Sequence, residues 1–191
     1  MRNDRSTAAL PSLRRLDTGD LDAVHLLLSN WDVVRYMLLP HCSREESAQF
    51  LRDAMDEHAS PAWRSVVRAV VDGDSGRLIG LGGIAILLGA EEGELWYLLD
   101  PACWGRGLGS CCARQLAALG FGELQLHRVW ATCLPENPAS GRVLEKVGMR
   151  LEGFLKGHLK IHGEWKDCFL YAMLREEWES QERAAAPWLP R

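Results

Sequence analysis

Residues 103–112, with the sequence CWGRGLGSCC, combine the residue types that could bind an anion. Glycines at 105, 107 and 109 have no Cβ, so the backbone there could approach a ligand closely. A strand is expected before the stretch and a helix after it, and a helix N-terminus presents free N–H groups and about half a unit of positive charge. Arg106 and Ser110 could add side-chain contacts. The stretch predicts either a phosphate site or a tight strand-to-helix turn.

Two common nucleotide motifs do not fit these glycines. A Walker loop requires G-x-x-x-x-G-K-[ST], and here both the spacing and the lysine are missing. The dinucleotide fingerprint requires G-x-G-x-x-G after a first strand, whereas the glycines here run G-x-G-x-G and the first third of the chain is rich in predicted helix. Neither class of nucleotide-binding protein is therefore predicted.

The cysteines offer a third interpretation, metal or thiol chemistry, and their spacing argues against it. Cys111 and Cys112 are adjacent, a poor spacing for two ligands of one zinc ion, and the chain has no C-x-x-C motif. Helical spacing instead places Cys112 in one buried stripe with Leu108, Leu116 and Leu119. We therefore predict no metal site, and nothing in the sequence points to export and disulfide formation.

Hydrophobic periodicity and turn signals predict a mixed α/β sheet. Ser43 and Glu46 form a capping box, Thr18 or Asp20 could cap an earlier helix, and Asn137 before a proline begins a later one. Hairpins are expected at the turns 72–76 and 162–163. Strands are predicted at 11–16, 63–72, 77–87, 93–100, 127–134, 150–161 and 164–174, and helices at 17–30, 43–58, 108–124 and 137–148.

Composition bounds the class of protein. The 191 residues, 47% of them hydrophobic, suit one domain, and a net charge of −4 argues against a nucleic-acid partner. The longest uncharged apolar run, residues 78–90, is shorter than the roughly 20 residues of a membrane span and contains glycines. The first ten residues lack the apolar core of a signal peptide. We therefore expect a cytoplasmic protein with no membrane partner.

Three motifs, taken in order, resemble a known family. They are WGRGLG at 104–109, PENPASGRVLEKVGMRLEG at 135–153 and HGEWKDCFLYAMLREEW at 162–178. The chain resembles the GNAT superfamily of acetyl-CoA-dependent N-acetyltransferases, and most closely its branch that acetylates ribosomal-protein N-termini. The resemblance covers residues 11–178, leaving a flexible arm at 1–10 and a tail at 179–191. It implies a single-domain α/β (α+β) fold, with a mixed, mostly antiparallel sheet of about seven strands that is flanked by helices and splayed at the cofactor slot.

This resemblance also implies how coenzyme A would bind. The family's phosphate loop, [Q/R]-x-x-G-x-[G/A], falls on residues 104–109, with Trp104 in place of the usual Gln or Arg. The strand at 96–99 would pair with the pantetheine arm. Asn137 would contact that arm, although its role as a helix cap explains it equally well. The implied cofactor-binding residues are Leu98, Leu99, Trp104, Gly105, Arg106, Gly107, Leu108, Gly109, Ser110, Asn137 and Ser140.

Acetyl transfer to an amine needs a base for the amine and an acid for the leaving thiolate. Glu94 is the first candidate base and His158 the second, and each could instead be an ordinary strand residue. The resemblance implies Ser140 as the acid, because the tyrosine that many relatives carry is replaced by Leu144. One ribosomal enzyme has a glutamate where this chain has Leu159, and this departure argues against a ribosomal-protein substrate.

The predicted function is N-acetylation of a primary amine by acetyl-CoA without a metal. The acceptor would be a protein N-terminus or a small amine, selected by residues 31–45, where Trp31, Tyr36 and His41 either line a pocket or belong to the core. The alternative is a non-catalytic acyl-CoA-binding or regulatory protein of the same fold. The last two predicted strands are apolar and could form the interface of a homodimer.

Overall fold

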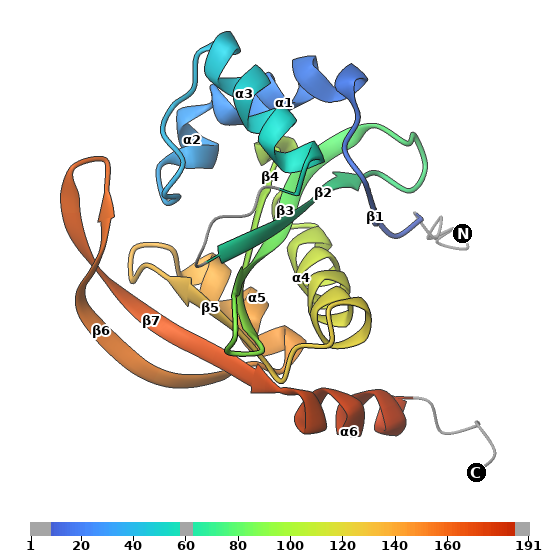
Figure 1. The fold of residues 1–191 in the computed structure, drawn as a ribbon, viewed down its shortest axis with the longest axis vertical. Coiled ribbons are helices and arrows are strands. Elements are labelled where there is room, and N and C mark those ends of the chain that lie inside the picture. The colour runs from blue at the N-terminus through green and yellow to red at the C-terminus, as the bar shows by residue number, and fades with distance from the viewer. Residues whose placement is uncertain (1–8, 58–62, 186–191) are drawn as a thin grey trace, which may run out of the picture.

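The computed structural model describes residues 9–57 and 63–185. Seven strands form one sheet in the order β1-β2-β3-β4-β5-β7-β6, and only β4 and β5 are parallel (Figure 1). The predicted mixed, mostly antiparallel sheet is confirmed. The strands are β1 (Ser12–Arg14), β2 (Trp63–Val71), β3 (Leu78–Leu87), β4 (Glu92–Leu99), β5 (Arg128–Cys133), β6 (Arg150–Ile161) and β7 (Glu164–Leu174).

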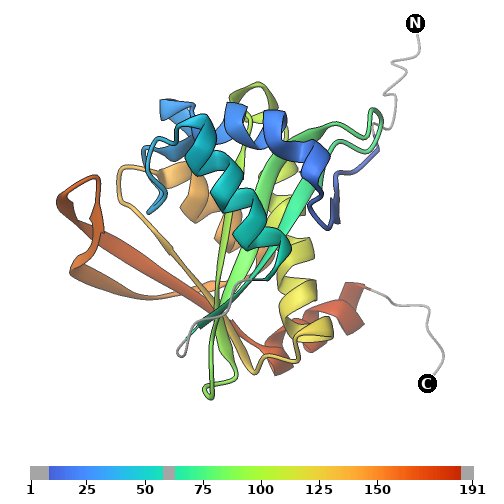
Figure 2. The same ribbon diagram turned by 45° about the horizontal axis from the view of Figure 1, so that its top comes forward.

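Helices cover both faces of the sheet (Figures 1 and 2). On one face, α1 (Leu21–Leu28), α2 (Trp31–Val34) and α3 (Arg44–Met55) bury an apolar cluster that includes Leu28, Leu81 and Leu98. On the other face lie α4 (Leu108–Ala118), α5 (Pro138–Val147) and α6 (Arg175–Ala185). The sheet is thus the middle layer between two separate cores.

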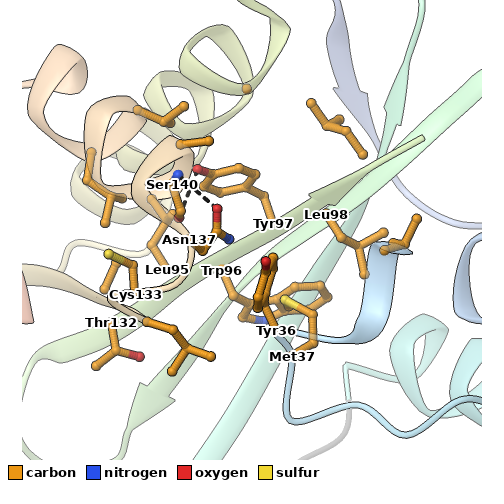
Figure 3. Close-up of a pocket in the computed structure, with 18 of the residues that line it drawn as sticks. Tyr36, Met37, Leu95, Trp96, Tyr97, Leu98, Thr132, Cys133, Asn137 and Ser140 are labelled. Atoms are coloured by element: carbon orange, nitrogen blue, oxygen red, sulfur yellow. Dashed lines mark hydrogen bonds between the residues drawn. The ribbon is translucent and has the colours of Figure 1, made fainter. Parts of the chain in front are cut away.

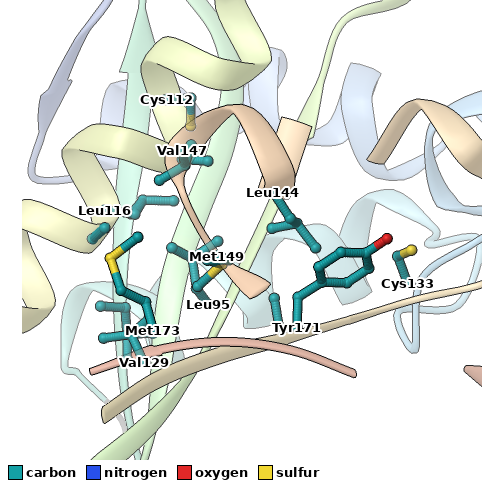
Figure 4. Close-up of a cluster of buried hydrophobic side chains, with 14 of the residues drawn as sticks. Leu95, Cys112, Leu116, Val129, Cys133, Leu144, Val147, Met149, Tyr171 and Met173 are labelled. Atoms are coloured by element: carbon teal, nitrogen blue, oxygen red, sulfur yellow. The ribbon is translucent and has the colours of Figure 1, made fainter. Parts of the chain in front are cut away.

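The second core joins two strands and two helices. Leu95 of β4, Leu116 of α4, Val129 of β5 and Leu144 of α5 are each at most 2% exposed and pack together (Figure 4). Cys112 also lies in this core, as the predicted helical stripe required. Because several elements share one close-packed interior, their relative positions are held rigidly.

The start of the domain differs from the prediction. The helix expected at 17–30 is a 3₁₀ turn, Thr18–Asp20, followed by α1. Asp17 forms the capping box of the turn, so neither predicted cap, Thr18 or Asp20, caps α1 with its side chain. The Asp20 carboxylate instead accepts bonds at 2.6 and 2.7 Å from Arg14. The capping box of Ser43 and Glu46 is confirmed at α3.

The C-terminal end of the domain also differs. The final helix α6 continues past residue 178, where the tail was expected to begin, and packs through Trp178 against Phe121. Charged residues dominate the sequence of α6 and Trp178 is its large apolar anchor, so hydrophobic periodicity does not predict this helix. Residues 186–191 of the predicted tail, and residues 1–8 of the predicted arm, lie outside the described residues.

Candidate active site

The parallel strands β4 and β5 separate after three residue pairs. Glu92, Gly93 and Glu94 pair with residues 128–130, and beyond them the two strands diverge. A cavity of about 780 Å³ opens between the strands and extends beneath α2 (Figure 3). The splay that was expected at the cofactor slot is therefore present, and backbone groups at the end of β4 are free to pair with a ligand.

The glycine loop turns the chain sharply from β4 into α4 at one end of this cavity. Gly105 and Gly107 have φ of 73° and 81°, a region that favours glycine, and a Cβ at either would meet no protein atom within 4 Å. Gly107 is the N-cap of α4 and offers no side chain to bond the first amides of the helix. The indole nitrogen of Trp104 donates to the carbonyl of Leu99 at 2.9 Å, tying the loop to the strand end. The helix N-terminus is thus uncovered toward the cavity.

Most of the predicted cofactor residues line this cavity. Arg106 does not, because it is exposed between the two glycines with positive φ. Two cations that the sequence analysis missed, Arg142 and Lys146, do line it from α5. The predicted residues found in the lining are Leu98, Leu99, Trp104, Gly105, Gly107, Leu108, Gly109, Ser110, Asn137 and Ser140.

Asn137 and Ser140 meet at the start of α5. The amide of Ser140 donates to Asn137 Oδ1 at 3.3 Å, so the predicted N-cap is confirmed. The Ser140 hydroxyl lies 3.2 Å from the hydroxyl of Tyr97 on β4 (Figure 3). Burial raises the pKa of Tyr97 well above its usual range, so this phenol stays protonated and can donate to Ser140. Tyr97 was not among the predicted site residues.

Glu94 lies half-buried in the cavity wall and is no solvated edge residue. Thr132 Oγ1 donates to its carboxylate at 2.9 Å. Burial raises the pKa of Glu94, while the bond from Thr132 and the charge of His158 lower it in part. A carboxylate with a raised pKa is a better proton acceptor than an exposed one, which suits a general base.

His158 lies outside the cavity lining. It is exposed on β6, within a bulge where the pairing of β6 with β7 skips from Leu155 to Leu159 and Gly157 has φ of 54°. It acts on Glu94 through its charge. Of the two candidate bases, Glu94 lines the cavity and His158 does not.

The positions that depart from the family pattern have different surroundings. Leu144 is 1% exposed, packs in the core and also lines the cavity, so an apolar side chain stands where many relatives have a tyrosine. Leu159 lines the cavity, as does Tyr36. Trp31 and His41 do not line it, and Trp31 instead packs against His162, with ring centroids 4.8 Å apart.

A family model described as "Acetyltransferase (GNAT) domain" matches residues 12–150. The chain belongs to the GNAT acetyltransferase family. As a member it is an acyltransferase. The predicted resemblance is confirmed.

Relatives agree with this assignment. The uncharacterised N-acetyltransferase YnaD of Bacillus subtilis is 32% identical over 166 residues, covering 87% of this chain and 94% of the relative. A GNAT-family acetyltransferase structure from Bacillus anthracis superposes with a TM-score of 0.78 at 31% identity, covering 90% and 98% of the two chains. The spermidine N-acetyltransferase of Vibrio cholerae, solved in complex with CoA and spermine, has a TM-score of 0.76 at 24% identity, covering 88% and 98%. The last likeness supports the fold.

Two structural features are absent from the described part of the GNAT chain. Among residues 9–57 and 63–185, no three His, Cys, Asp or Glu side chains gather in a way that could hold a metal ion. None of the helices in these ranges is both long and apolar enough to cross a membrane.

Proposed function

We propose that this GNAT enzyme transfers the acetyl group of acetyl-CoA directly to a primary amine. One observation carries the proposal. The glycine loop and the half-buried carboxylate of Glu94 line the same cavity, which opens where β4 and β5 separate. Direct transfer needs an anion site for the coenzyme and a base for the amine in one continuous space. The residue roles below are part of this proposal.

The cavity residues fit coenzyme A. Gly105 and Gly107 leave open space where any other residue would place a Cβ, and the amides of Leu108 and Gly109 begin α4 without a side-chain cap. These groups would hold the pyrophosphate. The Arg142 and Lys146 side chains on α5 add positive charge to the same lining. When bound, acetyl-CoA would supply the activated acyl group.

The side chains of the slot can handle both protons of the reaction. Glu94 takes a proton from the amine, directly or through water, as the amine nitrogen forms the new C–N bond. Ser140, held by Asn137 and next to Tyr97, gives a proton to the sulfur as the C–S bond breaks. Glu94 then releases its proton to solvent and Ser140 regains one from solvent, so both side chains return to their starting states. The products are the N-acetylated amine and free coenzyme A. Tyr97 thus replaces the missing helix tyrosine as the phenol nearest the leaving group.

The acceptor is expected to be a protein N-terminus or a small amine. The test incubates the purified protein with acetyl-CoA and panels of peptides and amines, and measures release of free thiol. Calorimetry with coenzyme A measures cofactor binding separately. Binding with turnover of at least one amine is expected. Binding without any turnover would contradict the enzyme function and favour an acyl-CoA-binding protein.

Removal of the Ser140 hydroxyl should slow the chemical step. Ser140→Ala is expected to lower kcat by about tenfold to a hundredfold with little change in KM for acetyl-CoA, because water can replace a general acid only in part. Tyr97→Phe should have a smaller effect of the same kind, since its hydroxyl acts through Ser140. Steady-state kinetics check both values.

Tyr171→Phe is the matched control for the tyrosine change. Its hydroxyl donates to Glu145 at 3.2 Å, and the residue does not line the cavity. It should keep kcat within about twofold, as for a substitution away from the reacting groups. Equal kcat for Ser140→Ala and the unaltered enzyme would remove Ser140 from the mechanism.

A further inference from the structure

The cavity continues past Glu94 into a chamber whose floor is the sheet. Strand register places Glu94 in one row with Ser65 and Ala85, so small side chains lie beside the carboxylate. The next row contains Trp96 and Gly83, and a Cβ on Gly83 would lie 3.1 Å from the Trp96 ring. The Trp96 indole therefore lies over Gly83 and contributes an aromatic ring to the chamber.

Apolar side chains also form the roof and the far wall. Tyr36 and Met37, between α2 and α3, lie beside Trp96 (Figure 3). Phe50 of α3 joins the roof. Tyr36 also packs with Leu159 of β6 and with the buried Leu134 that follows β5. Three aromatic rings and several aliphatic side chains thus surround the space next to the candidate base.

Charges are few in this chamber and mostly compensated. Asp32 and Arg35 lie 3.5 Å apart, and the Arg35 guanidinium also covers the Tyr36 ring at 4.8 Å. Glu136 is exposed at the rim. Glu94 is the carboxylate that reaches the interior. An acceptor with several separated positive charges would therefore find one interior partner and would lose hydration at its other charges.

We propose that the acceptor is a primary amine on an uncharged, ring-bearing apolar body. This inference rests on the proposed function, because it takes Glu94 as the group that receives the amine. The ring would pack between Trp96 and the roof residues Tyr36 and Phe50, and the amine would point to Glu94. A free arylalkylamine and a peptide with an N-terminal phenylalanine both present this chemistry.

The first test measures acceptor binding to the coenzyme A-saturated protein by calorimetry, so it does not depend on turnover. The probes are phenethylamine, spermidine, and two peptides that differ only in beginning with Phe or Ser. Phenethylamine is expected to bind at least about tenfold more tightly than spermidine, from burial of one aromatic ring. The peptide pair identifies the source of the amine. If the peptide that begins with Phe also binds about tenfold more tightly than the one that begins with Ser, the acceptor is a protein N-terminus. Equal or tighter binding of spermidine would overturn the inference.

Turnover of the same four probes separates this inference from the function. Preferred binding of phenethylamine without acetylation of any probe would contradict the proposed function while leaving the apolar chamber established. Acetylation of spermidine with a kcat/KM equal to or above that of phenethylamine would support the function and overturn the chamber's specificity.

Leu159→Glu tests the wall of the chamber. This substitution places a carboxylate beside Tyr36 and Leu134, and we expect phenethylamine binding to weaken by about tenfold while spermidine binding strengthens. Coenzyme A affinity should stay unchanged, which also checks folding. Leu26→Glu is the control, because Leu26 is 71% exposed on α1 and outside the cavity. Unchanged phenethylamine binding in Leu159→Glu would count against the chamber.

Discussion

Glu94→Gln is expected to lower kcat/KM by about 10²–10⁴-fold, the usual contribution of a general base. The amide keeps the size of the side chain and can still accept the bond from Thr132, whose hydroxyl lies 2.9 Å from the carboxylate. The change therefore removes proton acceptance while leaving the cavity wall in place. Coenzyme A affinity should stay within about twofold, since the proposed anion site lies at the glycine loop.

The pH profile of the unaltered enzyme gives a second readout of Glu94. Burial raises the pKa of this carboxyl, and a proposed base must be a carboxylate to accept the proton of the amine. Activity should therefore fall as the pH decreases through this raised pKa, above the usual range for glutamate. Because the charge of His158 lowers the pKa of Glu94, His158→Gln should move the acid limb to higher pH without abolishing activity. The Glu94→Gln enzyme should show no such decrease of its residual activity at low pH.

Glu92→Gln is the control for the base. Glu92 begins the same strand, lies 3.6 Å from Arg128 in an ion pair, and does not line the cavity. Its substitution should leave kcat/KM and the acid limb nearly unchanged. A Glu94→Gln enzyme that retained full activity with an intact acid limb would show that another group is the base.

Local features, which depend on residues close together in the chain, could be predicted from the sequence. The Ser43–Glu46 capping box, the Asn137-Pro138 helix start and the turn at 162–163 each depend on hydrogen bonds or backbone preferences within a few positions. The glycine loop belongs with them, because its positive φ angles need glycine locally. The order of strands and helices could be predicted along most of the chain for the same reason, because hydrophobic periodicity and turn residues are local signals.

Contacts between distant residues could not be predicted in this way. Tyr97 and Ser140 are 43 positions apart, and Thr132 and Glu94 are 38 apart, so only the folded sheet brings each pair together. The sequence did contain one indication of Tyr97, because its hydroxyl-bearing ring lies on the strand predicted to bind the cofactor. Arg142 and Lys146 had a readable signal too, since positions i and i+4 share one helix face.

The sequence leaves Trp31 and His41 open between the acceptor pocket and the core, and both side chains are exposed instead. Their positions in the segment 31–45 made them candidates for the acceptor pocket alongside Tyr36, but only Tyr36 lines the cavity. Periodicity cannot decide this, because the short helix α2 has only four residues and the segment after it is irregular. The direction of each side chain there depends on packing against β4 and the β6–β7 hairpin.

Gly107→Val is expected to weaken coenzyme A binding by about 10²–10⁴-fold, the loss of two hydrogen bonds from amides to a charged group. A Cβ at Gly107 would meet no protein atom within 4 Å, so the added side chain would occupy the open space before the first amides of α4. Calorimetric titration with coenzyme A measures the loss. The steric effect must be separated from backbone strain, because φ is 81° and valine rarely adopts this conformation.

Gly89→Val separates the two effects. Gly89 has φ of 84°, its Cβ would also meet no protein atom within 4 Å, and it lies outside the cavity lining. Both variants should lose similar stability, about 1–2 kcal/mol for a side chain in the left-handed region, measured as the free energy of unfolding. Only Gly107→Val should lose coenzyme A. Equal affinity in the two variants would mean that the glycine loop serves only to turn the chain, and the phosphate site would then have to lie elsewhere in the slot.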